Sequence, residues 1–202
     1  MARYTGSKNK LARKVGEDLG LKTNALKVAR RLMVRPGQHG HRGRRKLSDY
    51  GIQLQEKQKV KYIYGILEKQ LHSVYKEASK NPTATGSALL GFLERRLDNV
   101  VYRVGWAPTR FAARQLVSHG HIQVNGKKLN VSSYRVQVDD VINIKDKSTK
   151  IPFVAELLKE SETTVPEWLE KKGAVIKIKR IPAREDVAER IDEQLVVEYY
   201  SR

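Results

Sequence analysis

The sequence predicts an α+β protein, with helices in its first half and an antiparallel sheet in its second. Apolar residues recur every three or four positions from Val60 to Val104, which is the period of amphipathic helices. From Ile122 the period changes to two, and Asn125-Gly126 is the strongest short signal for a β-hairpin. A stretch rich in Lys, Arg and Gly precedes both patterns and predicts a basic N-terminal arm.

Two helices are predicted between residues 48 and 81. Ser48 can cap the first, because its side-chain oxygen can accept a hydrogen bond from a free backbone N–H, and Asp49 is favourable at that end of the helix dipole. Gly65 predicts a break between the two helices. Asn81-Pro82 ends the second helix, since proline has no N–H to continue it.

Two further helices are predicted before the hairpin. A third helix runs from Leu90 to Val104, where the apolar residues keep helical spacing. Thr109 can cap a fourth, Arg110 to His119, which stops at Gly120 because glycine readily adopts the left-handed conformation that ends many helices.

The second half of the chain is predicted to form a sheet with two helical segments. Strands are expected on both sides of the hairpin turn and at 134–138, 141–144 and 174–181, where apolar and polar residues alternate. A short helix is expected at 165–171. A last helix is expected over 186–199, although Leu195-Val196-Val197 also favours a strand.

Net charge is the strongest indication of a partner. The 40 Lys and Arg residues exceed the 22 Asp and Glu residues by 18, and such an excess repels itself unless a polyanion neutralises it. Residues 1–61 hold 17 basic and 4 acidic side chains, residues 62–140 hold 11 and 6, and residues 141–202 hold 12 of each. We therefore expect the first two thirds to bind nucleic acid; a solvated flexible tail is the alternative for residues 1–46.

Composition also excludes several classes of protein. The chain has no cysteine, which rules out disulfides and thiolate metal sites. No apolar run approaches the ~20 residues of a membrane span, and no apolar signal core follows the basic N-terminus. We expect a cytoplasmic protein; a mitochondrial transit peptide, which is also basic and poor in acids, is the alternative.

Basic side chains gather around the predicted third and fourth helices and the hairpin. The cluster comprises Arg95, Arg96, Arg103, Arg110, Arg114, Lys127 and Lys128. Proteins recognise folded RNA mainly through backbone shape, phosphates and 2′-hydroxyls, and the guanidinium fork matches phosphate oxygens. We therefore predict an RNA-binding surface. The alternative is that Arg95 and Arg96 pair with Glu94 and Asp98 on a solvated helix face, for about a few tenths of a kcal/mol per pair.

The run Arg-Gln-Leu-Val-Ser-His-Gly-His-Ile-Gln-Val-Asn-Gly, at Arg114 to Gly126, adds a specific signal. It closely resembles the RNA-binding module shared by ribosomal small-subunit protein four, several pseudouridine synthases and some tyrosyl-tRNA synthetases. Five more runs resemble the bacterial-type protein-four family itself: Arg35 to Gly40, Lys46 to Lys59, Tyr64-Gly65, Leu93 to Arg103 and Glu193 to Arg202. The resemblance covers essentially the entire chain.

This resemblance implies an organisation and a function. It implies a basic arm (1–46), a mainly helical domain (47–92, completed by a C-terminal helix at 184–202) and an inserted RNA-binding module of helix-turn-helix and antiparallel sheet (93–183). The family is structural, not enzymatic. It binds small-subunit (16S-type) rRNA at a multi-helix junction of the 5′ domain, nucleates assembly and supports translational accuracy at the interface with small-subunit protein five. Small-subunit protein three and mRNA are further implied neighbours; no cofactor, small-molecule substrate or membrane is expected.

By position, the resemblance carries rRNA contact to two sets of residues. In the arm and helical domain they are Arg35, His39, Arg42, Arg44, Arg45, Lys46, Tyr50, Lys57, Lys59 and Lys61. In the module they are Arg95, Arg96, Arg110, Arg114, His119 and His121. The chain departs from one branch of the family in lacking N-terminal zinc-binding cysteines, so its arm is expected to be ordered by RNA. Asp139-Asp140 stands where many relatives have Gly-Asp.

Other functions receive less support. Metal ligation is not expected at His39, His41, His72, His119 or His121, because no carboxylate cluster accompanies them. A pseudouridine synthase would use the same module for docking, but fewer than ~60 residues follow the module, which leaves little room for a catalytic domain. A DNA-binding regulator would use Thr109 to Gly120 as its recognition helix.

Overall fold

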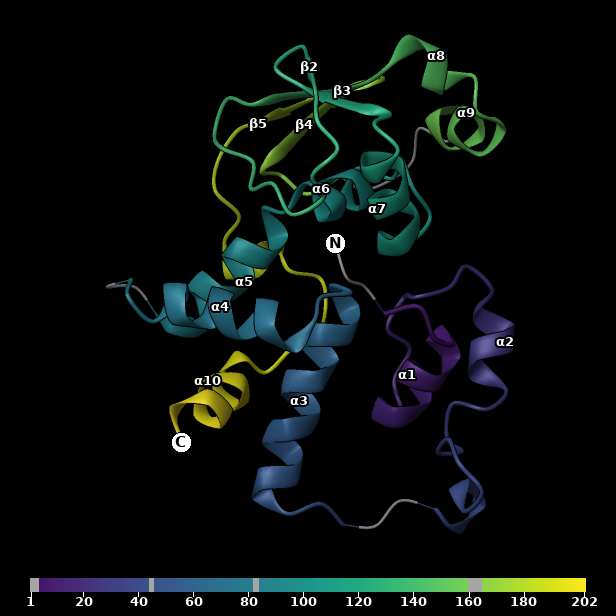
Figure 1. Cartoon of the computed structure of the whole chain (residues 1–202), viewed down its shortest axis with the longest axis vertical. Helices are drawn as coiled ribbons and strands as arrows, with labels where there is room; N and C mark the ends of the chain where they lie inside the picture. The colour runs from purple at the N-terminus through teal and green to yellow at the C-terminus, as the bar shows by residue number, and fades with distance from the viewer. Residues whose placement is uncertain (1–3, 44–45, 82–83, 160–164) are drawn as a thin grey trace. The chain divides into compact units, whose positions relative to one another are not determined.

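The computed structural model describes residues 4–43, 46–81, 84–159 and 165–202. The helices and strands in these ranges confirm the predicted α+β class. They divide into two compact units (Figure 1). The terminal unit comprises Met1–Leu89 and Glu189–Arg202, and the central unit comprises Leu90–Ala188. Within the described ranges, no helix has the length and apolar character needed to cross a membrane.

The terminal unit is helical. Its elements are α1 (Lys8–Val15), α2 (Ala25–Ala29), the 3-10 turn η1 (Gly40–Arg42), α3 (Asp49–Ile63), α4 (Glu68–Ala78), the beginning of α5 (Thr85–Glu94) and α10 (Glu193–Ser201). As predicted, the Ser48 side chain accepts a hydrogen bond from the Gly51 N–H, and Gly65 separates α3 from α4 with a left-handed φ of 60°. α3 packs against both α10 and α1.

The described residues of the predicted basic arm (1–46) contain helical structure, and α1 lies against α3. The three apolar residues of α1, Leu11, Ala12 and Val15, are buried although charged and polar residues surround them in the sequence. Arg13 then holds the following loop, because its Nε donates to the Val34 carbonyl at 2.8 Å and its Nη2 to the Arg35 carbonyl at 3.0 Å. The described part of this segment therefore packs on the helical unit through α1.

The central unit combines helices with one antiparallel sheet. After the end of α5 come α6 (Leu97–Arg103), α7 (Arg110–Ser118), β1 (Ile122–Val124), β2 (Lys127–Lys128), β3 (Val141–Ile144), α8 (Asp146–Thr149), α9 (Pro152–Lys159), β4 (Leu169–Lys172), β5 (Val175–Ile178) and the 3-10 turn η2 (Arg184–Asp186). The strand order is β2-β1-β3-β5-β4. The predicted hairpin is confirmed: Val124 pairs with Lys127, and Asn125 and Gly126 both have positive φ, 49° and 76°.

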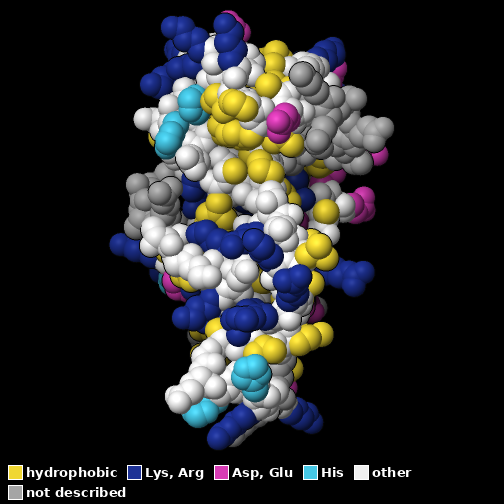
Figure 2. Space-filling view, turned by 90° about the vertical axis from the view of Figure 1, so that its right-hand side faces the viewer, with side chains coloured by type: hydrophobic (Ala, Val, Ile, Leu, Met, Phe, Trp, Pro, Cys, Tyr) yellow, Lys and Arg dark blue, Asp and Glu magenta, His cyan; other side chains and the backbone are white. Residues whose placement is uncertain are grey.

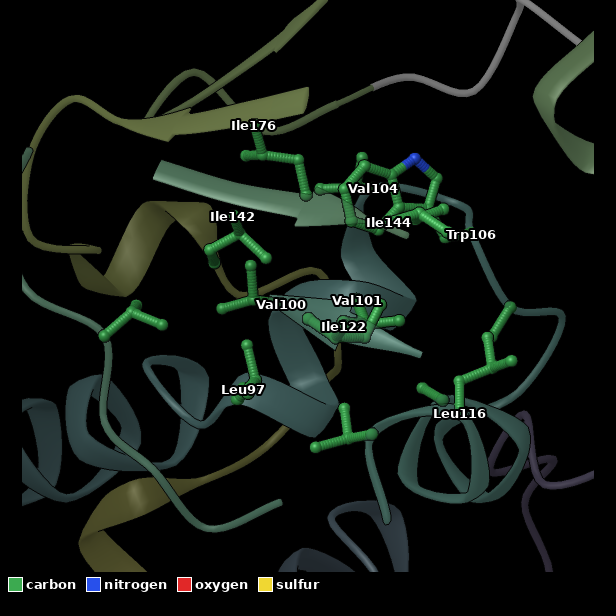
Figure 3. Packing of buried hydrophobic residues seen from close by; sticks show 14 of the residues in the cluster. Leu97, Val100, Val101, Val104, Trp106, Leu116, Ile122, Ile142, Ile144 and Ile176 are labelled. Atoms are coloured by element: carbon green, nitrogen blue, oxygen red, sulfur yellow. The ribbon is translucent and has the colours of Figure 1, made fainter. Parts of the chain in front are cut away.

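One hydrophobic core joins this sheet to α6 and α7. Figure 3 shows Ile122, Ile142 and Ile176 of the sheet lying over Val100 and Val101 of α6. All five side chains are fully buried. Burial of an aliphatic side chain of this size contributes about 1.5–3 kcal/mol, so this packing is what fixes α6 and α7 against the sheet.

The predicted third helix is wrong as a single element, because the chain breaks between α5 and α6. The Leu97 N–H donates to the Tyr134 carbonyl at 2.8 Å, and the Val136 N–H donates to the Arg95 carbonyl at 2.9 Å. These long-range bonds replace helical ones and leave Arg96 extended, with φ −67° and ψ 136°. The strand predicted at 134–138 is reduced to an isolated bridge between Arg96 and Arg135.

Two predictions near the C-terminus also need correction. The helix predicted at 165–171 is wrong, because β4 occupies Leu169–Lys172 and pairs with β5. The last helix begins later than predicted, at Glu193, where the Asp192 side chain accepts hydrogen bonds from the N–H groups of Gln194 and Leu195. Val196 is helical and fully buried, so the apolar run there serves a helix and not a strand.

Candidate nucleic-acid interface

The arginines predicted to bind RNA lie around the break between α5 and α6, and carboxylates organise them. Asp98 accepts hydrogen bonds from Arg96 Nε and Nη2 at 3.1 and 2.8 Å, and from Arg114 Nε and Nη2 at 2.9 and 2.7 Å. The side chains are only 9% (Arg96), 12% (Arg114) and 4% (Asp98) exposed. Two guanidiniums therefore share one carboxylate inside the unit.

Glu94 organises a second group next to it. This carboxylate is fully buried and accepts hydrogen bonds from Arg103 Nε and Nη2 at 2.9 and 2.7 Å and from Asn99 Nδ2 at 2.7 Å. Asn99 in turn accepts from Arg110 Nε at 2.7 Å, and the Arg110 guanidinium lies 4.5 Å from the centre of the Tyr102 ring. The network ties α5, α6 and α7 together.

The alternative prediction, that Arg95 and Arg96 pair with nearby carboxylates on a solvated helix face, is partly correct. Arg96 does pair with Asp98, but in a buried position and not on a solvated helix face. Arg95 is held by the loop, since its Nε donates to the Val136 carbonyl at 2.9 Å. The buried arginines present little of their surface, so their positions are set first by the protein itself.

His119, His121, Lys127 and Lys128 lie at the other end of α7 and have a different environment. Within the part of the chain that the structure describes, none of the four forms an ion pair. His119 caps α7 and is exposed, as are Lys127 and Lys128 on β2. The charged side chains of Lys127 and Lys128 are therefore available to a ligand.

The lysines of α3 are engaged within the terminal unit. Lys57 and Lys61 reach Glu68 at 2.8 and 3.1 Å, and Lys59 reaches Glu17 at 2.7 Å. Burial tends to raise the pKa of Glu68, but hydrogen bonds from Lys57, Tyr200 and Lys61 hold that pKa below its ordinary value. The predicted lysines thus connect α3 to α4 and to Glu17, which follows α1, and Tyr200 brings α10 into the same cluster.

The remaining predicted residues of the terminal unit lie at or near its surface. His39, Arg42, Lys46 and Tyr50 are exposed, and Arg35 is half-buried. Arg44 and Arg45 lie outside the described residues. On the face drawn in Figure 2, Lys and Arg side chains are spread widely over the surface.

Two further exposed arginines, Arg30 and Arg31, lie at the end of α2, and the sequence pattern did not single them out. Neither forms an ion pair in the described ranges. Two large apolar neighbours, Leu26 and Met33, are each 77% exposed. The signal for this surface was the basic composition of residues 1–46, which does not distinguish one arginine from the next.

Two protein families match successive segments of the chain. Residues 3–94 match the family described as "Ribosomal protein S4/S9 N-terminal domain", and residues 95–142 match the family described as "S4 domain". Proteins named "Small ribosomal subunit protein uS4" from Brevibacillus brevis and Parabacteroides distasonis are each 48% identical over 204 residues. The namesake from Akkermansia muciniphila is 48% identical over 206 residues. In all three comparisons the match covers 100% of this chain and 100% of the relative.

Proposed function

Since the chain belongs to the small ribosomal subunit protein uS4 family, we propose that it is a structural constituent of the small ribosomal subunit and binds small-subunit rRNA. Its two matched segments correspond to RNA-binding architecture, and its charge of +18 suits a polyanionic partner. The role is that of a scaffold and not of an enzyme.

The finer proposal concerns the place of binding. We propose that the chain binds a multi-helix junction in the 5′ domain of 16S-type rRNA, nucleates assembly there, and supports translational accuracy beside small-subunit protein five, with protein three and mRNA as further neighbours in the cytoplasmic ribosome. The charge distribution supports a divided surface. Residues 1–61 carry an excess of 13 positive charges and suit RNA, whereas residues 141–202 are balanced and suit protein contacts.

The observation that carries this proposal is the division of the cations into two kinds. Buried arginines such as Arg96 and Arg103 are neutralised by Asp98 and Glu94, so they build a rigid scaffold. Exposed cations such as Arg42, Lys127 and Lys128 form no ion pair in the described ranges. A rigid scaffold that holds unneutralised cations at fixed positions matches what recognition of a folded RNA by shape requires.

Chemical footprinting tests the proposal. The full chain is added to a transcript of the 5′ domain of small-subunit rRNA, and backbone cleavage by hydroxyl radicals is mapped. We expect protection of several helices that meet at one junction, and we expect the protection to weaken steeply as salt rises. Cleavage that is unchanged by the protein, or protection scattered evenly over the transcript, contradicts the proposal.

A further inference from the structure

We infer that one corner of the central unit is a phosphate subsite whose affinity increases when its half-buried histidine, His121, becomes protonated. The corner consists of His119, His121, Lys128, Lys145 and Ser148, and we call it the basic corner. The inference rests on the proposed function, because the phosphate in question belongs to the backbone of the bound RNA. It assigns Lys145 to the interface and Ser148 to the positioning of His121, and it makes RNA affinity dependent on pH.

The fold brings the basic corner together from α7 and three neighbouring segments. The rings of His119 and His121 lie 6.1 Å apart, centre to centre, on either side of Gly120. Gly120 has a φ of 73°, and a Cβ there would clash with Cε of Lys128. The Lys128 side chain therefore lies against the backbone of Gly120, the residue between the two histidines. Lys145 joins them because β1 pairs with β3, which places Ile122 opposite Ile144.

The charges in the basic corner are all of one sign. Burial lowers the pKa of His121, and the positive charges of His119, Lys145 and Lys128 lower it further. Asp146 is the carboxylate nearest in sequence, but it is exposed and makes no ion pair with these groups among the described residues. The C-terminal end of the α7 dipole offsets part of the repulsion, and an anion would offset the rest.

Ser148 can hold the His121 ring in one position whether the ring is neutral or protonated. Its Oγ lies 2.8 Å from His121 Nδ1, and the side chain is nearly buried. A hydroxyl can donate or accept. Ser148 can therefore donate to Nδ1 of the neutral ring that carries its proton on Nε2, and it can accept from Nδ1–H of the charged ring. In both states Nε2–H remains a donor for a phosphate oxygen. The ring gains a charge without losing its position.

The sign of the pH effect follows from this arrangement. Without RNA, the pKa of His121 lies below its ordinary value of about 6.5, so the ring is neutral at pH 8. A bound phosphate favours the charged ring and raises its pKa, so RNA binding takes up protons. Affinity for RNA then rises as the pH falls through the pKa of the bound state, and it levels off below the pKa of the free protein.

Filter binding at two pH values tests the inference. The full chain is titrated with a 5′-domain rRNA transcript at constant salt, at pH 8 and at pH 6. Because protonation of one coupled histidine can change affinity at most tenfold per pH unit, we expect binding to strengthen by roughly threefold to tenfold at pH 6. The double variant His119→Gln/His121→Gln should lose most of this difference. The control His72→Gln should keep it, because His72 stacks on Tyr200 in the terminal unit.

A second variant keeps the test decisive if the double variant does not fold. Lys128→Ala removes an exposed side chain and should reduce the slope of log affinity against log salt by about one. Wild-type pH dependence in the double variant, or an unchanged salt slope in Lys128→Ala, refutes the subsite while rRNA binding itself stands. Failure of the wild-type chain to bind the transcript at either pH instead refutes the proposed function.

Discussion

Asp98 is the residue on which the geometry of α6 and α7 depends most directly. It lies between the guanidiniums of Arg96 and Arg114, and it is 4% exposed. Removal of one partner from a buried ionic group leaves charges without compensation, and this destabilises far more than the loss of a surface pair.

We therefore expect Asp98→Ala to lower the free energy of unfolding by about 3 kcal/mol. Chemical denaturation measures the effect. Glu170→Ala is the matched control, because Glu170 pairs with the exposed Lys172 at 3.0 Å and should change stability little. Equal effects of the two substitutions would show that the Asp98 cluster does not act as a buried ionic group.

Glu68 predicts a dependence of stability on pH in the terminal unit. Its folded-state pKa is lowered, so its contribution to stability is present above its ordinary value of about 4.3 and is lost as the pH falls through the folded pKa. The wild type should therefore be more stable than Glu68→Gln at neutral pH, and the difference should shrink below about pH 4.3. Urea denaturation of both proteins from pH 7 to pH 3 measures it; a constant difference would contradict the role of the ionised carboxylate.

At the scale of residues, the sequence located the cations but not their partners. Arg96 and Asp98 are close in the sequence, yet nothing in the pattern shows that Arg114 also binds the Asp98 carboxylate. Nothing in the sequence pattern indicated Lys145 and Ser148 of the proposed basic corner, because they reach His121 only through the register of β1 on β3, which alternation does not specify.

The β1–β2 hairpin is the element whose local sequence determines its structure most clearly. Gly126 has a φ of 76°, and a Cβ at this position would meet nothing within 4 Å. Any loss of stability in Gly126→Ala therefore comes from the backbone and not from a clash.

We expect Gly126→Ala to lower the free energy of unfolding by about 1–2 kcal/mol, because left-handed backbone is unfavourable for residues with a Cβ. Gly51→Ala in α3 serves as the control. Its Cβ would lie 3.4 Å from Leu47 and Ser48, and a helical alanine should increase stability by about 0.5 kcal/mol. Thermal and chemical denaturation compare the two; a neutral or stabilising Gly126→Ala would contradict the turn geometry.

Among the helices and strands, local sequence signals predicted where helices begin and where the chain turns. They did not predict where a helix is interrupted. Ser48 and Thr109 cap their helices as their sequence predicts, since capping depends only on adjacent residues. The break after α5 was not predictable, because the N–H groups of Leu97 and Asp98 bond to carbonyls of Tyr134 and Ser132. β4 was missed for a similar reason: its pairing with β5 overrides a helical pattern.

In the molecule as a whole, we expect exposed cations to determine RNA affinity and buried cations to determine stability. The double variant Arg30→Ala/Arg31→Ala should reduce the slope of log affinity against log salt by about two, while the free energy of unfolding stays nearly unchanged. Both arginines are exposed and form no ion pair within the described part of the terminal unit. An unchanged slope would remove this surface from the interface.

The central claim is that this scaffold binds folded ribosomal RNA through unneutralised cations at fixed positions. Competition binding tests it most directly: the full chain is bound to a labelled 5′-domain rRNA transcript at about 0.15 M salt, where charge interactions beyond about 8 Å are screened, and challenged with unlabelled transcript or duplex DNA. We predict that the folded transcript competes at far lower concentration than the duplex. Equal competition by the two nucleic acids, or preference for DNA, would contradict the claim.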